Sequence, residues 1–329
     1  MPLKKFAAFF VVVVSALGSS ALSGEELTVH FKTTPQLKLL RPFADPADLA
    51  LLVTGADGRP VGEGSAVISL HAPPPGAFFS TDYPLVEGTL LSELRLPLRQ
   101  GKANWKYLFP IRGEYRLVVD VTANENRKAS KSFSFHVSEN PKKWLALGAF
   151  SATLFVFGFV AARVFTGKPT NRVSLVAAAL LASTAGSVAS QQRLASDAGL
   201  LKIEPATVGK PSEVSWSLAR GGTIAGATAA LSLTIAHLEK QKVVFAFDRV
   251  PVIGEWSMKF HFPDGAEYRV TAIAEVPGLA PLRAEETVSV TGIEPPAGPM
   301  IRALVYFTSL IALGLAAGRW SKRRSRSSA

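Results

Sequence analysis

Five histidines are the residues of this chain best suited to chemistry, because the sequence contains no cysteine and three methionines. His30 and His136 lie on the polar faces of two expected strands, and His71 ends a third strand. Imidazole is a good ligand for copper and zinc, so these three could form a metal site if the terminal strands meet. His237 and His261 could form a second pair across a sheet. The alternative is that all five are ordinary surface residues.

Catalytic patterns are missing from the sequence. It contains no nucleophile elbow, zinc-protease helix, phosphate-binding loop or calcium loop. The adjacent pairs Glu25-Glu26 and Glu285-Glu286 would point to opposite faces of a strand, whereas acid–base catalysis needs carboxylates that converge. We therefore expect no enzyme and no cofactor, apart from copper on the histidines.

The net charge of +11 comes from 36 basic and 25 acidic residues. Between residues 24 and 142, and again between 194 and 297, basic and acidic residues nearly balance. The excess flanks apolar runs instead, at residues 4–5, 163–172 and 319–326. This distribution is typical of membrane topology and argues against nucleic-acid binding.

Apolar runs divide the chain into exported and membrane segments. A short basic start, an apolar core and a small-residue site predict a secretory signal. Three later runs are long enough, with their flanks, to cross a hydrocarbon core, although the second is rich in alanine and could instead be a buried or surface helix. The expected segments are a signal peptide (1–23), spans at 143–166, 173–192 and 299–318, a loop (167–172) and a tail (319–329).

The positive-inside rule gives the expected orientation. The loop and the tail carry basic residues and no acidic ones, which places both in the cytoplasm. The two large regions, 24–142 and 194–297, then lie together on the other side. We expect a multi-pass protein of the bacterial cytoplasmic membrane with both regions on the periplasmic side.

Both large regions have the period-two pattern of strands. Leu27, Val29 and Phe31 alternate with polar residues in the first region, as do Trp256, Met258, Phe260 and Phe262 in the second. Short strands separated by turns every 8–12 residues predict an immunoglobulin-like antiparallel β-sandwich. The expected fold class is mainly β with transmembrane α: two such sandwiches joined by membrane-spanning helices.

Turn signals and a repeat refine this expectation. Ala56-Asp57-Gly58 and Pro263-Asp264-Gly265 predict hairpins, and Pro73-Pro74-Pro75-Gly76 opens an excursion that runs to about Leu98. Gly-Glu pairs at Gly113-Glu114 and Gly254-Glu255 suggest that one module was duplicated.

A family resemblance rests on three stretches of the sequence. They are His237 to Phe247, His261-Phe-Pro-Asp-Gly-Ala-Glu-Tyr-Arg-Val270 and Gly113-Glu-Tyr-Arg-Leu-Val-Val-Asp120. They resemble bacterial YtkA-like and FixH-like modules, small immunoglobulin-like domains of the envelope. That resemblance implies a link to copper handling or to assembly of respiratory oxidases, but the methionine and cysteine ligands that would support it are missing.

Partner binding is the other candidate activity. Phe78, Phe79 and Tyr83 of the excursion are the expected contacts with a partner, unless the excursion is a packed covering loop. The leading hypothesis is a non-catalytic accessory or assembly partner of a membrane complex, held to the lipid bilayer and bound to another membrane or envelope protein. The alternative is a histidine-based copper-binding accessory of the oxidase-assembly kind.

Overall fold

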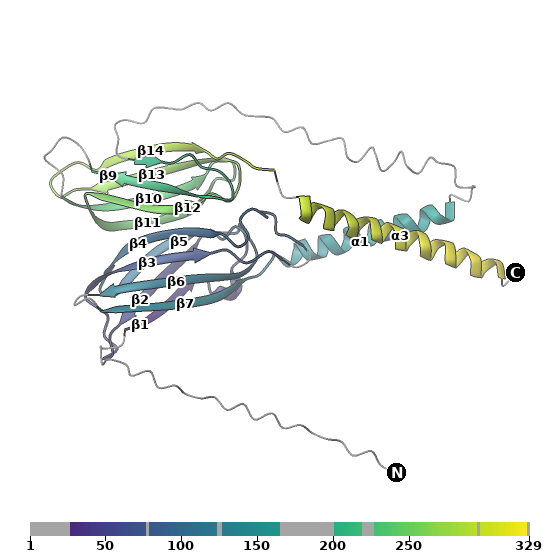
Figure 1. Cartoon of the computed structure of the whole chain (residues 1–329), viewed down its shortest axis with the longest axis horizontal. Coiled ribbons are helices and arrows are strands. Elements are labelled where there is room, and N and C mark those ends of the chain that lie inside the picture. Colours follow the sequence, from purple (N-terminus) through teal and green to yellow (C-terminus); the bar gives the residue numbers. More distant parts are fainter. Residues whose placement is uncertain are drawn as a thin grey trace, which may run out of the picture.

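The structure is a computed structural model that describes residues 27–76, 79–123, 127–164, 201–218, 227–294 and 297–327, with side chains of the last helix described to residue 323. It is mainly β, with two long helices that leave the same end of the β part (Figure 1). The expected signal peptide, the expected loop at 167–172 and the expected span at 173–192 lie outside the described residues.

The first β unit comprises seven strands before the first helix. They are β1 (Thr28–Thr34), β2 (Ala47–Thr54), β3 (Glu63–His71), β4 (Leu90–Arg99), β5 (Lys102–Tyr107), β6 (Gly113–Ala123) and β7 (Lys128–Val137). Apolar residues alternate with polar ones along them, and the apolar face is buried; in β6, for example, Tyr115, Leu117, Val119 and Val121 are all at most 1% exposed. The expected strand alternation is confirmed here.

The second β unit has seven more strands, between the two helices. They are β8 (Leu201–Ile203), β9 (Pro211–Ser217), β10 (Thr228–His237), β11 (Lys242–Ile253), β12 (Glu255–His261), β13 (Glu267–Glu275) and β14 (Leu282–Ser289). Their inward faces join those of the first unit in one hydrophobic core.

All fourteen strands belong to one large antiparallel sheet system. It consists of two runs of hydrogen-bonded strands, β14-β13-β10-β11-β5-β2-β1 and β7-β6-β3-β4-β12-β9-β8. In the described chain the runs are linked at the β4–β5 turn, through the pair Arg99 and Lys102. Each run contains strands of both units, so the two units are joined twice, by β5–β11 and by β4–β12.

The pairing of the first unit recurs in the second. Adding seven to each strand number converts the pairs β1–β2, β2–β5, β3–β4, β3–β6 and β6–β7 into pairs of the second unit. This supports the expected duplication, but the Gly-Glu pairs are not equivalent: Gly113 opens β6, and Gly254 precedes β12. The true counterpart of Glu114-Tyr115-Arg116 in β6 is Glu267-Tyr268-Arg269 in β13.

Both predicted hairpins are wrong in one respect. The turns form where expected, with Gly58 at φ 74° in the first, but each joins strands of different runs. β2 pairs with β1 and β5, whereas β3 pairs with β4 and β6; likewise β12 and β13 have no partner in common. A turn sequence reverses the chain, but it does not select the strand beside which the chain then lies.

The excursion after the three prolines is shorter than expected. β4 begins at Leu90, and Pro97 lies within it, opposite Ser65 of β3. Proline is tolerated because β4 pairs with β12 at residues 92–94, so Pro97 stands where that side of β4 is open. We call residues 79–89 the junction loop.

The helices α1 (Pro141–Val164) and α3 (Ala297–Ser327) are each long and apolar enough to cross a membrane. They pack side by side through small residues, because Gly158 and Ala162 of α1 face Gly314 and Gly318 of α3. A Cβ at Gly158 would lie 3.2 Å from Ile311 C and 3.2 Å from Leu315 N. This is the small-residue packing common between membrane helices.

Candidate functional site: the junction of the β units and the helices

The three histidines of the first unit are not brought together. β1 and β7 do approach, with Phe31 5.6 Å from both Phe133 and Phe135 between ring centroids. That contact uses the inward faces, so His30 and His136, one residue away from these aromatics, are exposed on the outward faces. The expected convergence of His30 and His136 is therefore wrong, because β1 and β7 belong to different runs that face each other.

The remaining histidines lie apart as well. His71 is half-buried at the end of β3, where burial and then the charge of Arg116 lower its pKa. His237 and His261 are buried at the ends of β10 and β12, which belong to different runs. Within the described ranges, which include all five histidines, no group of three or more His, Asp or Glu side chains could hold a metal ion.

His261 is a contact between the two β units. Its Nε2 accepts a hydrogen bond from the Gly209 N–H at 3.0 Å, and its Nδ1 lies 2.9 Å from Thr89 Oγ1. Since the Thr89 hydroxyl donates to Val86 O at 2.7 Å, Nδ1 is the donor and the ring is neutral. Burial lowers the pKa of His261 to about 4. His261 continues the polar side of the alternation in β12, yet it is buried, because the first unit covers this end of the strand.

Acidification is expected to weaken this contact. The folded pKa lies below the unfolded value of about 6.5, so the stabilisation is complete above pH 6.5 and is lost as the pH falls towards 4. At about 1.4 kcal/mol per unit, about 2 kcal/mol is lost by pH 5. Urea unfolding of the protein and of His261→Gln at pH 7 and pH 5 measures it, and the variant should lose about 2 kcal/mol less. An equal loss in both proteins would exclude His261 as the titrating group.

Asp264 is the centre of a second cluster, in the turn between β12 and β13. Its carboxylate accepts hydrogen bonds from the Tyr268 hydroxyl and from Lys240 Nζ at 2.6 Å, and lies 3.2 Å from His237 Nε2. Burial alone would raise the pKa of Asp264, but the hydrogen bonds from Lys240 and Tyr268 outweigh burial and lower it. The carboxylate is therefore ionised and fully engaged near neutral pH.

Lys240 connects this cluster to the first unit. Its Nζ donates to the Tyr83 hydroxyl at 2.8 Å and lies 4.1 Å from the centroid of the Phe43 ring. Phe43 and Tyr83 pack at 5.1 Å, so the ammonium sits between two aromatic rings and a carboxylate. Burial opposes the charge, yet the hydrogen bonds with Asp264 and Tyr83 raise the pKa of Lys240. These contacts hold the second unit against the first.

The junction loop also contacts both helices. Phe79 meets Tyr306 of α3 edge-on at 5.2 Å, and Asp82 forms an ion pair with Lys143 of α1. The loop is held in shape by Glu87, whose carboxylate accepts from the Ser80 hydroxyl at 2.8 Å and from the Thr81 N–H. One short loop therefore links the first unit to the second unit, to α1 and to α3.

Arg112 strengthens the root of α1. Its guanidinium pairs with the largely buried Glu139 at 3.2 Å, donates to Ser80 O and lies 5.2 Å from the centroid of the Trp144 ring. Glu139 also lies 3.7 Å from Lys143 Nζ, one helical turn further along the chain. These contacts connect the residue before β6, the junction loop and the start of α1.

The described aromatic residues that were expected to contact a partner protein thus contact residues of this chain. Tyr83 binds Lys240 and Phe43, and Phe79 packs on Tyr306, while Phe78 lies outside the described residues. Sequence reasoning missed Phe43, Lys240, Asp264 and Arg112. Asp264 and Lys240 had a signal, because each is a charged residue in a turn that directly follows a histidine-ended strand. The side chains of the junction connect the two β units and the helices. They pair with one another and do not point into a cavity.

The described structure defines a class of protein: mainly β, with two helices that could cross a membrane. No protein-family model and no curated protein matches the chain. Among solved structures, it is similar to the soluble domain of PmoD from Methylocystis sp. (14% identity, 33% of this chain and 90% of that chain, TM-score 0.23). It is also similar to the BSP domain of a biofilm-associated protein (12% identity, 78% and 29%, TM-score 0.19) and to a tetra-tandem repeat of a large adhesion protein (12% identity, 81% and 49%, TM-score 0.23). Identities and TM-scores this low carry no conclusion on function.

Proposed function

We propose that this chain is a non-catalytic protein of the bacterial cytoplasmic membrane that presents two immunoglobulin-like β-sandwiches on the periplasmic side, as an accessory or assembly partner of a membrane complex. The parallel course of α1 and α3 is the observation that carries the proposal. The resemblance to YtkA-like and FixH-like envelope modules agrees with it.

Successive contacts between α1 and α3 lie further along both helices in the same direction. Phe150 packs on Phe307 near the β units, and Arg163 donates to Ser321 at the far ends. Two helices that run in parallel cross a bilayer in the same direction. Arg163, Arg319, Lys322 and Arg323 all lie at the far end, which is the cytoplasmic end under the positive-inside rule.

The course of the chain supports three spans. Val164 ends α1 away from the β units, and Leu201 begins β8 within them. If α1 crosses the membrane, the chain has to return between these residues, and the uncharged stretch at 173–192 is the part long enough to do so.

Two features support the immunoglobulin-like sandwich. The strands form two runs whose buried faces share one core. In addition, the Tyr115 hydroxyl donates to Ile111 O, four residues upstream, at 2.6 Å, and Tyr268 bonds to Asp264, also four residues upstream. The bond of Tyr115 to a backbone carbonyl matches the tyrosine corner of sandwich folds, whereas Tyr268 bonds to a side-chain carboxylate at the corresponding place.

The binding role is favoured over the copper-binding alternative by the histidines themselves. Both ring nitrogens of His261 already have partners, and His30 and His136 face away from each other. A tightly connected junction suits a rigid platform that holds a partner at a fixed place above the bilayer.

Labelling of single cysteines tests the topology, since the chain has none of its own. Ser134→Cys and Ser257→Cys lie on exposed positions of β7 and β12, and Ser328→Cys lies in the tail. A membrane-impermeant maleimide should label positions 134 and 257 in intact spheroplasts. It should label position 328 after the spheroplasts are lysed. Labelling of residues 134 and 257 from opposite sides would refute the proposal. Cross-linking from the two exposed sites should then capture a membrane protein in a fixed ratio to this chain. Metal analysis of the protein purified without chelator should find no bound copper.

A further inference from the structure

The two joins between the β units are equivalent to each other. One join pairs β5 with β11, and the other pairs β12 with β4. Exchanging each strand with the strand seven places away in chain order turns one join into the other. The same exchange turns the run β14-β13-β10-β11-β5-β2-β1 into the run β7-β6-β3-β4-β12-β9-β8. An arrangement that is unchanged by such an exchange has a twofold axis between its halves.

A repeat in the sequence identifies the residues that correspond. Phe109-Pro110 precedes Glu114-Tyr115-Arg116 at the same spacing at which Phe262-Pro263 precedes Glu267-Tyr268-Arg269. A shift of 153 residues converts the first set into the second. The two tyrosines also pack alike, because each meets the phenylalanine six residues before it edge-on at 4.9 Å. This shift therefore gives the counterpart of each residue in the joins.

The register of the two joins follows this shift. Lys106 of β5 pairs with Ala246 of β11. The shift turns this pair into Lys259 and Glu93, which pair between β12 and β4. Strand order alone does not require this agreement, because strands in the same order can pair in another register. The two joins are therefore alike in strand order, in direction and in register.

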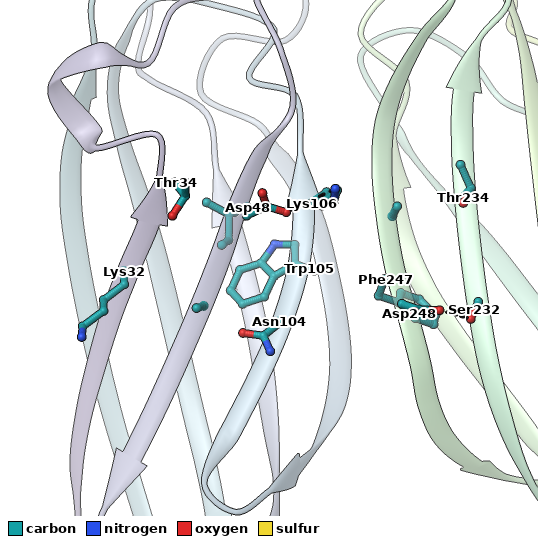
Figure 2. Close-up of a pocket in the computed structure, with 13 residues that line it drawn as sticks. Lys32, Thr34, Asp48, Asn104, Trp105, Lys106, Ser232, Thr234, Phe247 and Asp248 are labelled. Atoms are coloured by element: carbon teal, nitrogen blue, oxygen red, sulfur yellow. Dashed lines mark hydrogen bonds and ion pairs between the residues drawn. The ribbon is translucent and has the colours of Figure 1, made fainter.

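The joins differ at one place, and the cause is local. The β4–β12 join has a third pair, Leu94 with Met258. Its counterparts, Phe247 and Trp105, do not pair in the described chain, because β11 forms a bulge beyond them, with Arg249 at φ 50°. Figure 2 shows Trp105 and Phe247 on either side of the groove that lies there. A bulge bends a strand and disrupts its pairing, so this bulge accounts for the missing pair.

The two helices follow the same symmetry. They run in parallel, each after its own β unit (Figure 1). Gly158 of α1 lies against the backbone of Ile311 and Leu315, which stand three residues before and one residue after Gly314. Gly314 lies against α1 at the same two positions around Gly158. The packing is therefore mutual, as a twofold interface requires.

A second pair of helix contacts is related in the same way. Phe150 packs on Phe307 with ring centroids 5.4 Å apart, and the hydroxyl oxygen of Ser151 lies 3.3 Å from that of Tyr306. The correspondence of the two glycines makes Phe150 the counterpart of Tyr306. It makes Ser151 the counterpart of Phe307, so each of the two contacts is the image of the other.

Residues beside a twofold axis meet their own counterparts, and two such meetings occur in this chain. Tyr107 and Phe260 correspond, and their ring centroids lie 6.5 Å apart between the units. Ala162 and Gly318 correspond, and a Cβ at Gly318 would lie 2.8 Å from that of Ala162. The symmetry therefore holds between the units and between the helices alike.

We propose that this chain is a dimer fused into one polypeptide, in which each half consists of a β unit and the membrane span that follows it. The partner that each half recognises is a second copy of the same kind of module. The two joins and the α1–α3 contact together form the dimer interface. This inference rests on the proposed function, because it treats both helices as membrane spans.

A fused dimer accounts for the additional crossing in the proposed topology. A β unit followed by one span, repeated directly, would place the second unit on the opposite side of the membrane. One additional crossing, for which the stretch at 173–192 is long enough, returns the second unit to the side of the first. The two parallel spans can then pack as the two spans of a dimer do.

The first test removes the covalent link between the halves. A protease site is inserted between residues 196 and 197, ahead of β8, and the full-length protein is cleaved in detergent micelles. Because both joins and the helix contact remain, the two pieces should elute together in a 1:1 ratio during size-exclusion chromatography. Separation of the pieces at micromolar concentration in the same detergent would overturn the proposal.

The second test asks whether one helix recognises a copy of itself. Residues 305–318 of α3 are copied onto positions 149–162 of α1 in the full-length chain, which keeps glycine at position 158. Cysteine replaces residues 151 and 306, and a short bifunctional thiol reagent joins them in membranes. Cleavage at the inserted site then shows cross-linked halves as one band. A twofold interface accepts the copy, so cross-linking should stay within a factor of two of that with the original α1.

The matched control shifts the copy by one residue. Residues 304–317 are copied onto the same positions, so Leu313 stands at position 158 and the small residues turn away from α3 by about 100°. Cross-linking should fall at least fivefold. If the two copies cross-link equally, whether well or poorly, the twofold relation between the helices is wrong and the proposal fails. Cysteine labelling reports on the topology independently, so a failure of the proposed function is seen separately.

Discussion

Replacing Tyr115 with phenylalanine is expected to lower the free energy of unfolding by about 3 kcal/mol. The hydroxyl of this fully buried residue donates to Ile111 O at 2.6 Å and accepts from Ile111 N–H at 3.1 Å. Phenylalanine keeps the ring contacts with Phe109 and Phe135 but leaves a buried N–H and a buried C=O without this partner. Urea unfolding of the full chain in micelles, followed by tryptophan fluorescence, measures the loss.

Tyr268→Phe is the matched control in the second unit. It also removes a bond to a residue four positions upstream, but the acceptor is the carboxylate of Asp264, which keeps Lys240 and remains partly open to solvent. The expected loss is therefore about 1 kcal/mol. If the two variants lost the same amount, or Tyr115→Phe lost less than the control, the buried backbone groups of Ile111 would not be the cause.

Gly158→Leu is expected to separate the two helices. The new side chain would meet the backbone of Ile311 and Leu315 in α3, so the helices could not keep their present spacing. A cysteine pair at Ser151→Cys and Tyr306→Cys reports on this spacing when a short bifunctional thiol reagent joins the two sulfurs across the space that the Tyr306 ring occupies. The two side-chain oxygens lie 3.3 Å apart, and the chain has no other cysteine. Cross-linking by this reagent in membranes should fall at least fivefold.

Gly148→Leu provides the control for this change in the same helix. A Cβ at Gly148 has no atom within 4 Å among the described residues, so the same substitution there should leave cross-linking unchanged. Equal cross-linking in the Gly158→Leu and Gly148→Leu proteins would mean that α1 and α3 do not pack through Gly158. Loss in both would point to a general effect on membrane insertion.

Much of the secondary structure could be predicted from local pattern. Period-two alternation placed Val29, Leu117, Leu233 and Met258 on inward faces, where the structure has them buried. Two uncharged runs coincide with α1 and α3. These features depend on residues close in sequence, since side-chain direction within one strand or helix is set by local geometry.

The junction shows why the rest could not be predicted. His261 continues the polar face of β12 in sequence, but Thr89 of the other unit covers it. In sequence, Tyr83 and Phe79 look like the aromatic residues of a binding loop. In the structure, Tyr83 contacts Lys240 and Phe79 contacts Tyr306, each more than 150 residues away. Nothing within a strand or loop specifies such a distant neighbour.

By itself, the sequence determined which segments are strands and helices, which face of each is apolar, and that the charge excess lies beside apolar runs. The tertiary structure alone decided that the units join edge to edge, that the turns cross between runs, and that His261 and Lys240 of the second unit contact residues of the first. The physical reason is that backbone hydrogen bonds are alike in every strand. Apolar alternation therefore selects a face, whereas the neighbour is selected by the packing of the whole chain.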